Sequence, residues 1–166
     1  MSTYKNIIHV KHEFPIFAKS DSSILILGSI PSVKSRAQGF YYGHNKNRFW
    51  GLLATIFDEE APESIAEKKV FLEKHHIALF DVISECDIHR SSDASIKNVM
   101  PNDIKDVCLH HPIKKIILNG KTAESLFYRY NDVPNIEIIP LPSTSPANAK
   151  VDFTSLLKQW RQAILK

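Results

Sequence analysis

Hydrophobic positions along the 166 residues of this sequence follow two patterns that alternate with each other. Short, unbroken apolar runs rich in Ile and Leu predict strands that are buried on both faces of a sheet. Stretches with an apolar residue at every third or fourth position predict helices with one buried face. The predicted strands are residues 24–27, 77–83, 116–118 and 136–141, and the predicted helices are residues 49–57, 64–75, 101–110, 123–130 and 153–164.

The alternation of strands and helices predicts an α/β fold. Parallel strands need crossover connections, and helical crossovers cover the two faces of the sheet. We therefore expect a three-layer αβα sandwich around a central, mostly parallel four-stranded sheet, formed by one domain that spans residues 1–166. Pro101 is expected to open its helix and Asp152 to cap the last one. The polar stretch 87–98 is expected to be an ordered surface loop.

Small, hydroxyl-bearing and proline residues follow three of the predicted strands. Because the carboxyl ends of parallel strands meet at one edge of an open sheet, these segments are expected to border one ligand-binding crevice. They are Gly28-Ser29-Ile30-Pro31-Ser32, Asn119-Gly120-Lys121-Thr122 and Pro142-Ser143-Thr144-Ser145-Pro146.

Composition narrows the class of protein. No apolar run approaches the roughly 18 residues of a membrane span, so we expect an intracellular, cytoplasmic protein without membrane contact. Cys86 and Cys108 are too few for a four-thiolate metal site. The paired histidines at 75–76 and 110–111 lack companion ligands, so neither a metal nor another cofactor is expected.

Charge alone says little about a partner, because the formal net charge is only +3. Residues 34–48, however, carry basic and imidazole side chains without one carboxylate, which suits a phosphate-binding surface as well as a solvated loop. Candidates for contact with phosphate are Lys34, Arg36, Lys46, Arg48 and Lys121.

The chemistry in residues 28–50 suits a nucleobase. Aromatic rings at Phe40, Tyr41 and Tyr42 can stack on a base, although the first two suit core packing equally well. Main-chain amides of the loop at 28–32 can bind a base edge. Asn47 can hold a base or a water through its amide, or it can simply begin a helix.

Two separated motifs carry a family resemblance. Residues 28–32 (GSIPS) and 41–50 (YYGHNKNRFW) resemble the first motif of the mismatch-type branch of the uracil-DNA glycosylase superfamily, and most of all its hypoxanthine-DNA glycosylase subfamily. Residues 141–148 (LPSTSPAN) resemble the second motif of that subfamily. Residues 79–83 (LFDVI) and 119–121 (NGK) resemble its intermediate blocks, so the likeness covers about residues 24–160.

The resemblance implies roles for individual residues. Mismatch-specific uracil glycosylases place a water-activating Asn where this chain has Ile30, whereas the hypoxanthine subfamily assigns catalysis to the residue matching Asn47. Tyr42 would be the stacking aromatic. The second motif would grip DNA, although Leu141 stands where classical uracil glycosylases carry a His. The base would lie against Gly28, Ser29, Ile30, Pro31, Ser32, Tyr42 and His44, and DNA against Ser143, Thr144, Ser145, Pro146, Lys34, Arg36 and Lys121.

The roles of two polar residues are left open by the sequence. His44 suits a proton donor, a phosphate contact or a structural role. Asp81, at a predicted strand end, suits either a loop hydrogen-bond acceptor or a site residue.

The resemblance thus implies a glycosylase that removes hypoxanthine from DNA containing a damaged or mismatched base and leaves an abasic site. No amine nucleophile is evident, so monofunctional hydrolysis is expected, and nothing in the sequence requires more than a monomer. Three alternatives stay open. One is a uracil glycosylase acting on G:U mismatches or single strands. Another is a nucleic-acid-binding module that has lost catalysis, which Ile30 suggests. The third is an enzyme of small nucleotides, which lacks the expected phosphate-loop patterns.

Overall fold

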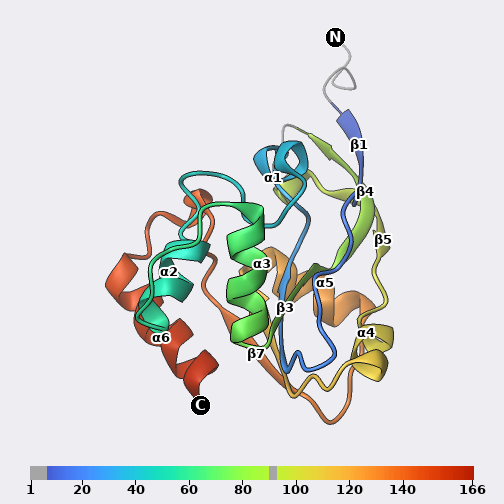
Figure 1. Cartoon of the computed structure of the whole chain (residues 1–166). Helices are drawn as coiled ribbons and strands as arrows, with labels where there is room; N and C mark the ends of the chain where they lie inside the picture. The colour runs from blue at the N-terminus through green and yellow to red at the C-terminus, as the bar shows by residue number, and fades with distance from the viewer. Residues whose placement is uncertain (1–6, 90–92) are drawn as a thin grey trace.

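The computed structural model describes residues 7–89 and 93–166, and a four-stranded parallel sheet lies at its centre (Figure 1). The strands stand in the order β3-β2-β6-β7, and all three neighbouring pairs are parallel. This confirms the predicted α/β fold and its central sheet. The bounds are Ile24–Gly28 for β2, Ile77–Asp81 for β3, Lys115–Asn119 for β6 and Glu137–Leu141 for β7.

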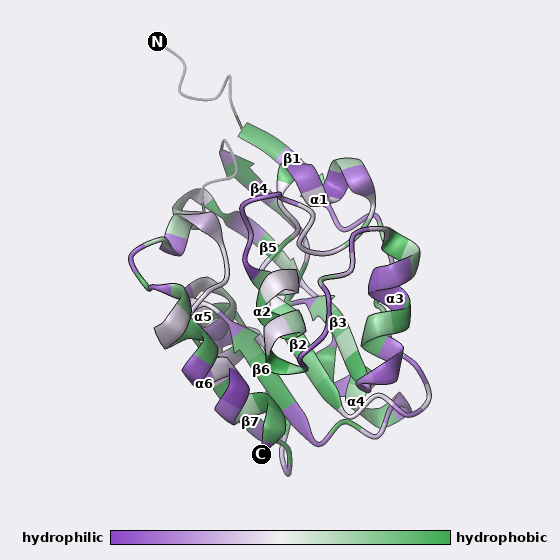
Figure 2. Cartoon of the chain, turned by 60° about the vertical axis from the view of Figure 1, so that its left-hand side comes forward, coloured by the Kyte–Doolittle hydropathy of each residue, from purple (hydrophilic) through white to green (hydrophobic). Residues whose placement is uncertain are grey.

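Helices cover both faces of this sheet, because successive side chains of a buried strand point to opposite faces. Ile26 and Ile117 pack in one core with α2, α3 and α6, whereas Leu25 and Leu118 pack in another with α4 and α5. Figure 2 shows the resulting apolar strands between amphipathic helices. The bounds are Phe49–Ile56 for α2, Ile65–Lys74 for α3, Ile104–His110 for α4, Lys121–Tyr130 for α5 and Phe153–Leu165 for α6.

Side-chain caps fix where several helices begin. Asp152 accepts a hydrogen bond from the Ser155 amide at 2.8 Å, as expected for the start of α6. The predicted start of α4 at Pro101 was wrong, because that proline ends a strand and Asp103 caps the helix instead. Within the described part of the chain, none of the helices is both long and apolar enough to cross a membrane.

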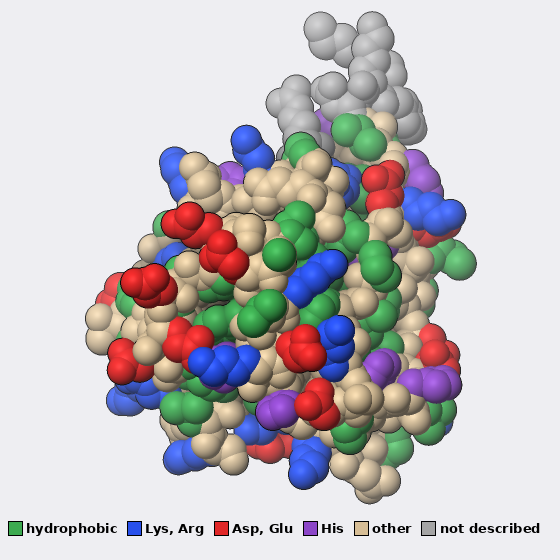
Figure 3. Space-filling model, in the orientation of Figure 1, with side chains coloured by type: hydrophobic (Ala, Val, Ile, Leu, Met, Phe, Trp, Pro, Cys, Tyr) green, Lys and Arg blue, Asp and Glu red, His purple; other side chains and the backbone are tan. Residues whose placement is uncertain are grey.

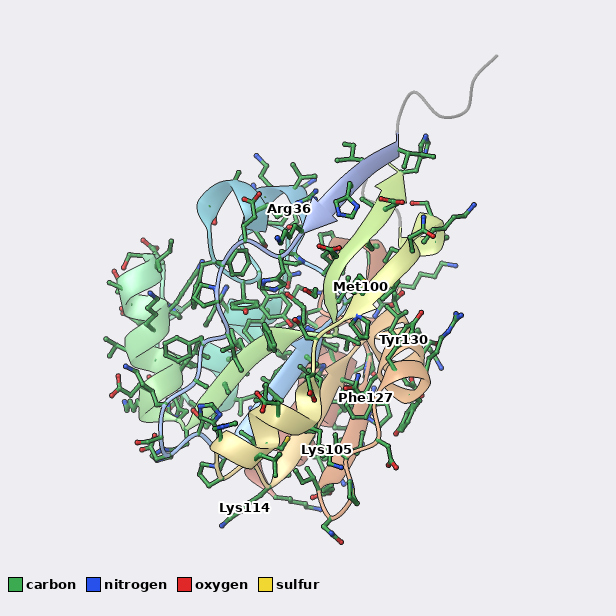
Figure 4. The ribbon with its side chains drawn as sticks, turned by 90° about the vertical axis from the view of Figure 1, so that its right-hand side faces the viewer. Arg36, Met100, Lys105, Lys114, Phe127 and Tyr130 are labelled. Carbon is green, nitrogen blue, oxygen red and sulfur yellow. The ribbon has the colours of Figure 1, made fainter. Side chains whose placement is uncertain are left out.

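A second, antiparallel sheet was not predicted. It contains β1 (Ile7–Lys11), β4 (Ile83–His89) and β5 (Lys97–Pro101) in the order β1-β4-β5, and Figure 4 shows Met100 on its outer strand. The predicted surface loop at 87–98 was therefore wrong at both ends, whereas residues 90–92 lie outside the described part. The apolar run 77–83 likewise spans two strands, because the chain passes from one sheet to the other at Val82.

A short helix, α1 (Val33–Gln38), follows β2 and was also not predicted. Ser32 caps it by accepting a hydrogen bond from the Ser35 amide at 3.2 Å. Gly39 ends it with a φ of 75°, a left-handed conformation that glycine adopts without steric cost. The helix turns the chain back toward the sheet, so that the aromatic residues at 40–42 return to the carboxyl ends of the strands.

Candidate functional site

The carboxyl ends of the central strands open into a cavity of about 760 Å³. Its walls come mainly from the loop after β2, the segment before α2, the start of α5 and the loop after β7, and the end of β3 contributes Asp81. Tyr42, Asn47 and Ser143, which are far apart in the sequence, all line it. Further lining residues are Gly28, Ser29, Ile30, Pro31, Ser32, Arg36, Asp81, Asn119, Lys121, Thr144 and Ser145.

The floor of the cavity has room for no side chain at Gly28. A Cβ atom there would lie 2.6 Å from Asp81 Oδ1 and 3.2 Å from the Tyr42 hydroxyl oxygen. The next two amides, those of Ser29 and Ile30, meet no hydrogen-bond acceptor among the described residues. Both residues line the cavity, so their main-chain donors are free to bind a ligand there.

Tyr42 lies on the cavity wall with its ring stacked on Phe49. The ring centroids are 4.0 Å apart and the planes are 24° from parallel. Tyr42 also has a φ of 54°, a costly left-handed conformation for a bulky side chain that commonly marks functional positions. Its hydroxyl is buried and makes no hydrogen bond of standard geometry with the described residues. Burial, reinforced by Asp81, raises the pKa of the phenol, and the nearby Asn119 side chain opposes this effect.

Asn47 both stabilises the start of a helix and lines the cavity. Its Oδ1 accepts a hydrogen bond from the Phe49 amide at 3.0 Å, which stabilises the start of α2. The same side chain lines the cavity. The helix-start role and a role at the cavity are therefore compatible in one residue.

Arg48 links the two motifs. Its amide donates to the Thr144 carbonyl at 3.1 Å, and its guanidinium donates to the carbonyls of Asn148, at 3.0 Å, and Val151. This guanidinium, a candidate for phosphate contact in the sequence, is instead engaged by the loop after β7. Its bonds hold that loop against the start of α2.

The loop after β7 is fixed from below by two further contacts. Asn119 and Thr144 exchange two hydrogen bonds in the buried layer beneath it. Trp160 of α6 donates its indole N–H to the Pro142 carbonyl at 2.9 Å. Next to them, a Cβ at Gly120 would lie only 2.8 Å from the Ser143 Cβ, so a glycine is needed where the two loops meet.

The remaining predicted residues divide between the cavity and the outside. Arg36, which Figure 4 places at α1, and Lys121 both line the cavity. Lys34, His44 and Pro146 do not; the His44 ring instead accepts a hydrogen bond from the Lys46 amide at 3.0 Å. Over α3, the front face in Figure 3 mixes acidic with basic side chains, which is typical of a solvated surface.

Phe40 and Tyr41 belong to the core. Phe40 is 5% exposed and stacks on Trp50, with 6.3 Å between the ring centroids. Tyr41 is 2% exposed, and its hydroxyl donates to the Pro15 carbonyl at 3.1 Å. The packing alternative therefore describes both of these rings. Tyr41 and Tyr42 both border the cavity, but Tyr42 is the less buried of the two and is the better candidate for contact with a ligand.

His12 is the polar residue near the cavity that sequence reasoning missed. Its Nε2 lies 2.8 Å from Asp81 Oδ2, and burial raises the pKa of this carboxyl, an effect that His12 opposes. No motif marks His12, because it reaches the site only through the unpredicted strand β1. Across residues 7–89 and 93–166, no three His, Cys, Asp or Glu side chains are grouped as a metal site would require.

A parallel sheet with a cavity at its carboxyl edge is the arrangement of an α/β protein that binds its ligand at the strand ends. A family model described as "Uracil DNA glycosylase superfamily" matches residues 14–164, and the chain belongs to this superfamily.

Relatives point to one branch of it. A protein of Methanosarcina acetivorans named "Hypoxanthine DNA glycosylase" is 32% identical over 143 residues, covering 85% of this chain and 90% of the relative. A protein of the same name from Methanosarcina barkeri is 32% identical over 117 residues, covering 68% and 73%. A solution NMR structure from Methanosarcina acetivorans, described as a candidate uracil DNA glycosylase, superposes with a TM-score of 0.80 at 28% identity and covers 95% of this chain and 97% of its own.

Proposed function

We propose that this protein is a monofunctional DNA glycosylase that hydrolyses the N-glycosidic bond of hypoxanthine in DNA and leaves an abasic site. The observation that carries the proposal is the convergence of Tyr42, Asn47 and the unused amides of Ser29 and Ile30 on one cavity. Its volume, about 760 Å³, suits a nucleotide turned out of a duplex. The names of the two curated relatives support the choice of base.

The cavity residues suggest how the bond is broken. Extrusion of the nucleotide costs a few kcal/mol, least for a poorly paired base, which favours a mismatched inosine. The base then stacks on Tyr42, and the free amides donate to it. Asn47 orients the attacking water toward C1′ through its carboxamide. The departing base takes the electron pair of the C1′–N9 bond, and main-chain donors stabilise the resulting anion. The water loses a proton as its oxygen bonds to C1′, and the base anion or solvent takes up that proton.

Two substitutions in the motifs favour this mechanism over that of a uracil glycosylase. The aliphatic side chain of Ile30 cannot orient a water, and it packs beside the core of the second sheet. Leu141 lines the cavity but cannot stabilise a leaving anion electrostatically. Main-chain donors must therefore stabilise the leaving anion, and Asn47 must orient the water.

A base-release assay tests the proposal. Oligonucleotides with one inosine, uracil, xanthine or mismatched thymine are incubated with the wild type, and abasic sites are counted after alkaline cleavage. We expect the fastest base release from the inosine oligonucleotide, and a rate of release at least about 100-fold lower in Asn47→Ala. Asn45→Ala, an exposed neighbour outside the cavity, is the matched control. Activity that survives in Asn47→Ala, or a wild type that releases no base, contradicts the proposal.

Hydrolysis without a covalent intermediate is part of the same proposal. No amine nucleophile is needed if Asn47 acts on water, so borohydride should trap no adduct between the protein and inosine-containing DNA. A trapped adduct would assign a lyase mechanism instead. We further propose that the protein acts as a monomer, inside the cell, on DNA containing a damaged or mismatched base.

A further inference from the structure

A buried histidine–aspartate pair lies at the floor of the cavity. His12 Nε2 and Asp81 Oδ2 are 2.8 Å apart, and the two side chains are only 5% and 4% exposed. Asp81 lines the cavity, whereas His12 lies behind it among the rings of Phe14, Tyr41 and Phe80. No step of the proposed hydrolysis uses this pair.

The hydrogen bonds of His12 determine where the protons are. Its Nδ1 lies 2.7 Å from the Phe14 carbonyl oxygen, which can only accept, so Nδ1 carries a hydrogen. The short contact between Nε2 and Asp81 Oδ2 then holds one proton, on either atom. With the proton on His12, Asp81 is a carboxylate; with the proton on Oδ2, Asp81 is a neutral acid. In both cases Oδ1 carries no hydrogen and can only accept.

Asp81 Oδ1 is the oxygen that a ligand would meet. It lies over Gly28, 2.6 Å from the place a Cβ would take, and no described residue donates a hydrogen bond to it. The free amides of Ser29 and Ile30 follow Gly28 directly in the chain. The floor therefore combines an obligate acceptor with donors, and this pattern matches the adjacent N1–H and C6=O of hypoxanthine. Adenine presents the opposite pattern, a bare N1 beside an amino group.

We propose that Asp81 selects the deaminated base by accepting a hydrogen bond from its N1–H, and that His12 is the positioning residue that keeps Oδ1 an acceptor. This inference rests on the proposed function and names the group that reads the base. Without His12, a neutral Asp81 could turn its acid hydrogen toward the cavity and donate it to N1 of adenine. Selection against the normal base would then be lost.

Binding measurements on DNA with one variable base test the inference. Hypoxanthine, adenine or 1-methylhypoxanthine is placed opposite an abasic analogue, so that none is paired, and Kd is measured with Asn47→Ala to prevent release. We expect hypoxanthine to bind at least about tenfold more tightly than either other base, because a hydrogen bond to an acidic group is lost in both. Equal binding of the three bases would overturn the inference.

Variants of His12 in the same background separate positioning from folding. His12→Ala should bring the ratio of hypoxanthine to adenine binding close to one, whereas His12→Gln, whose amide can still donate to Oδ2, should keep most of it. An unchanged ratio in His12→Ala would overturn the inference. If His12→Ala fails to fold, Asp81→Ala must lose the ratio, because it removes the oxygen that accepts from N1–H. Base release by the wild type tests the proposed function separately, since an enzyme that releases hypoxanthine yet binds the three bases alike contradicts only this inference.

Discussion

Asn119 and Thr144 exchange two hydrogen bonds beneath the cavity: Asn119 Nδ2 donates to the Thr144 hydroxyl at 3.1 Å, and its Oδ1 accepts from the Thr144 amide at 3.0 Å. Both residues are buried, at 9% and 0% exposure. The end of β6 thereby fixes the loop that follows β7. Residues 119–121 and the loop at 141–148 are thus held together as one structural unit.

Removal of this link should affect both stability and activity. Asn119→Ala leaves the buried Thr144 amide without an acceptor, which costs about 1–3 kcal/mol of unfolding free energy. Because the loop of Ser143 loosens, base release should fall further than the stability alone explains. Urea unfolding and single-turnover base release measure the two effects. Ser64→Ala, which removes a helix cap far from the cavity, is the control and should lower stability with activity intact.

Arg48 and Lys121 should differ in their effect on the salt dependence of DNA binding. The guanidinium of Arg48 is engaged by backbone carbonyls, whereas Lys121 is exposed at the cavity rim. Lys121→Ala should reduce the slope of log K against log salt by about one, and Arg48→Ala should weaken binding without changing the slope. The measurement is a titration of DNA binding at several salt concentrations, and Lys158→Ala on α6 is the control. A smaller slope in Arg48→Ala would mean that this side chain reaches phosphate.

The sequence predicted the central sheet because three of its strands, β2, β3 and β6, are buried on both faces. Such strands are unbroken apolar runs, as in β2 and β6, and they need no context to be recognised. The second sheet escaped prediction because its outer strands are mostly exposed: in β1 only Val10 is buried, and in β5 every residue except the half-buried Val99 is exposed. Their pairing with β4 stabilises them, and pairing is a tertiary property that local patterns do not contain.

Some residues of the candidate site could likewise be predicted from the sequence, and others could not. The loops of Ser29 and Ser143 could be predicted to meet, because all strands of a parallel sheet end at the same edge. His12 could not be predicted, because it reaches Asp81 only through the antiparallel strand that brings it there. The role of Arg48 was also hidden, since its partners are backbone carbonyls that any sequence provides.

Glu59 should contribute stability that depends on pH. Its pKa is lowered mainly by the hydrogen bond from Lys74, with a further contribution from His75. A carboxyl whose folded pKa lies below its ordinary 4.5 stabilises the folded state above that pH, and the contribution is lost as the pH falls through the folded value. Glu59→Gln should therefore have a lower Tm than the wild type at pH 7 and an equal Tm in strong acid. The difference should shrink in high salt, because the pair is partly exposed; a Tm difference that persists in acid would contradict this origin.

Tyr42 allows the ring and the hydroxyl to be tested apart. The hydroxyl is buried and makes no hydrogen bond of standard geometry with the described residues, so Tyr42→Phe removes an uncompensated polar group and should leave stability unchanged or higher. The stack on Phe49 and the ring at the cavity wall remain, so base release should be retained. Tyr42→Ala removes the surface on which the base stacks, about 1–3 kcal/mol, and should slow release about tenfold or more. Thermal unfolding and single-turnover release of the two variants give the comparison. If Tyr42→Phe slows release at unchanged stability, the hydroxyl itself binds the base, and the stacking role assigned to the ring is incomplete.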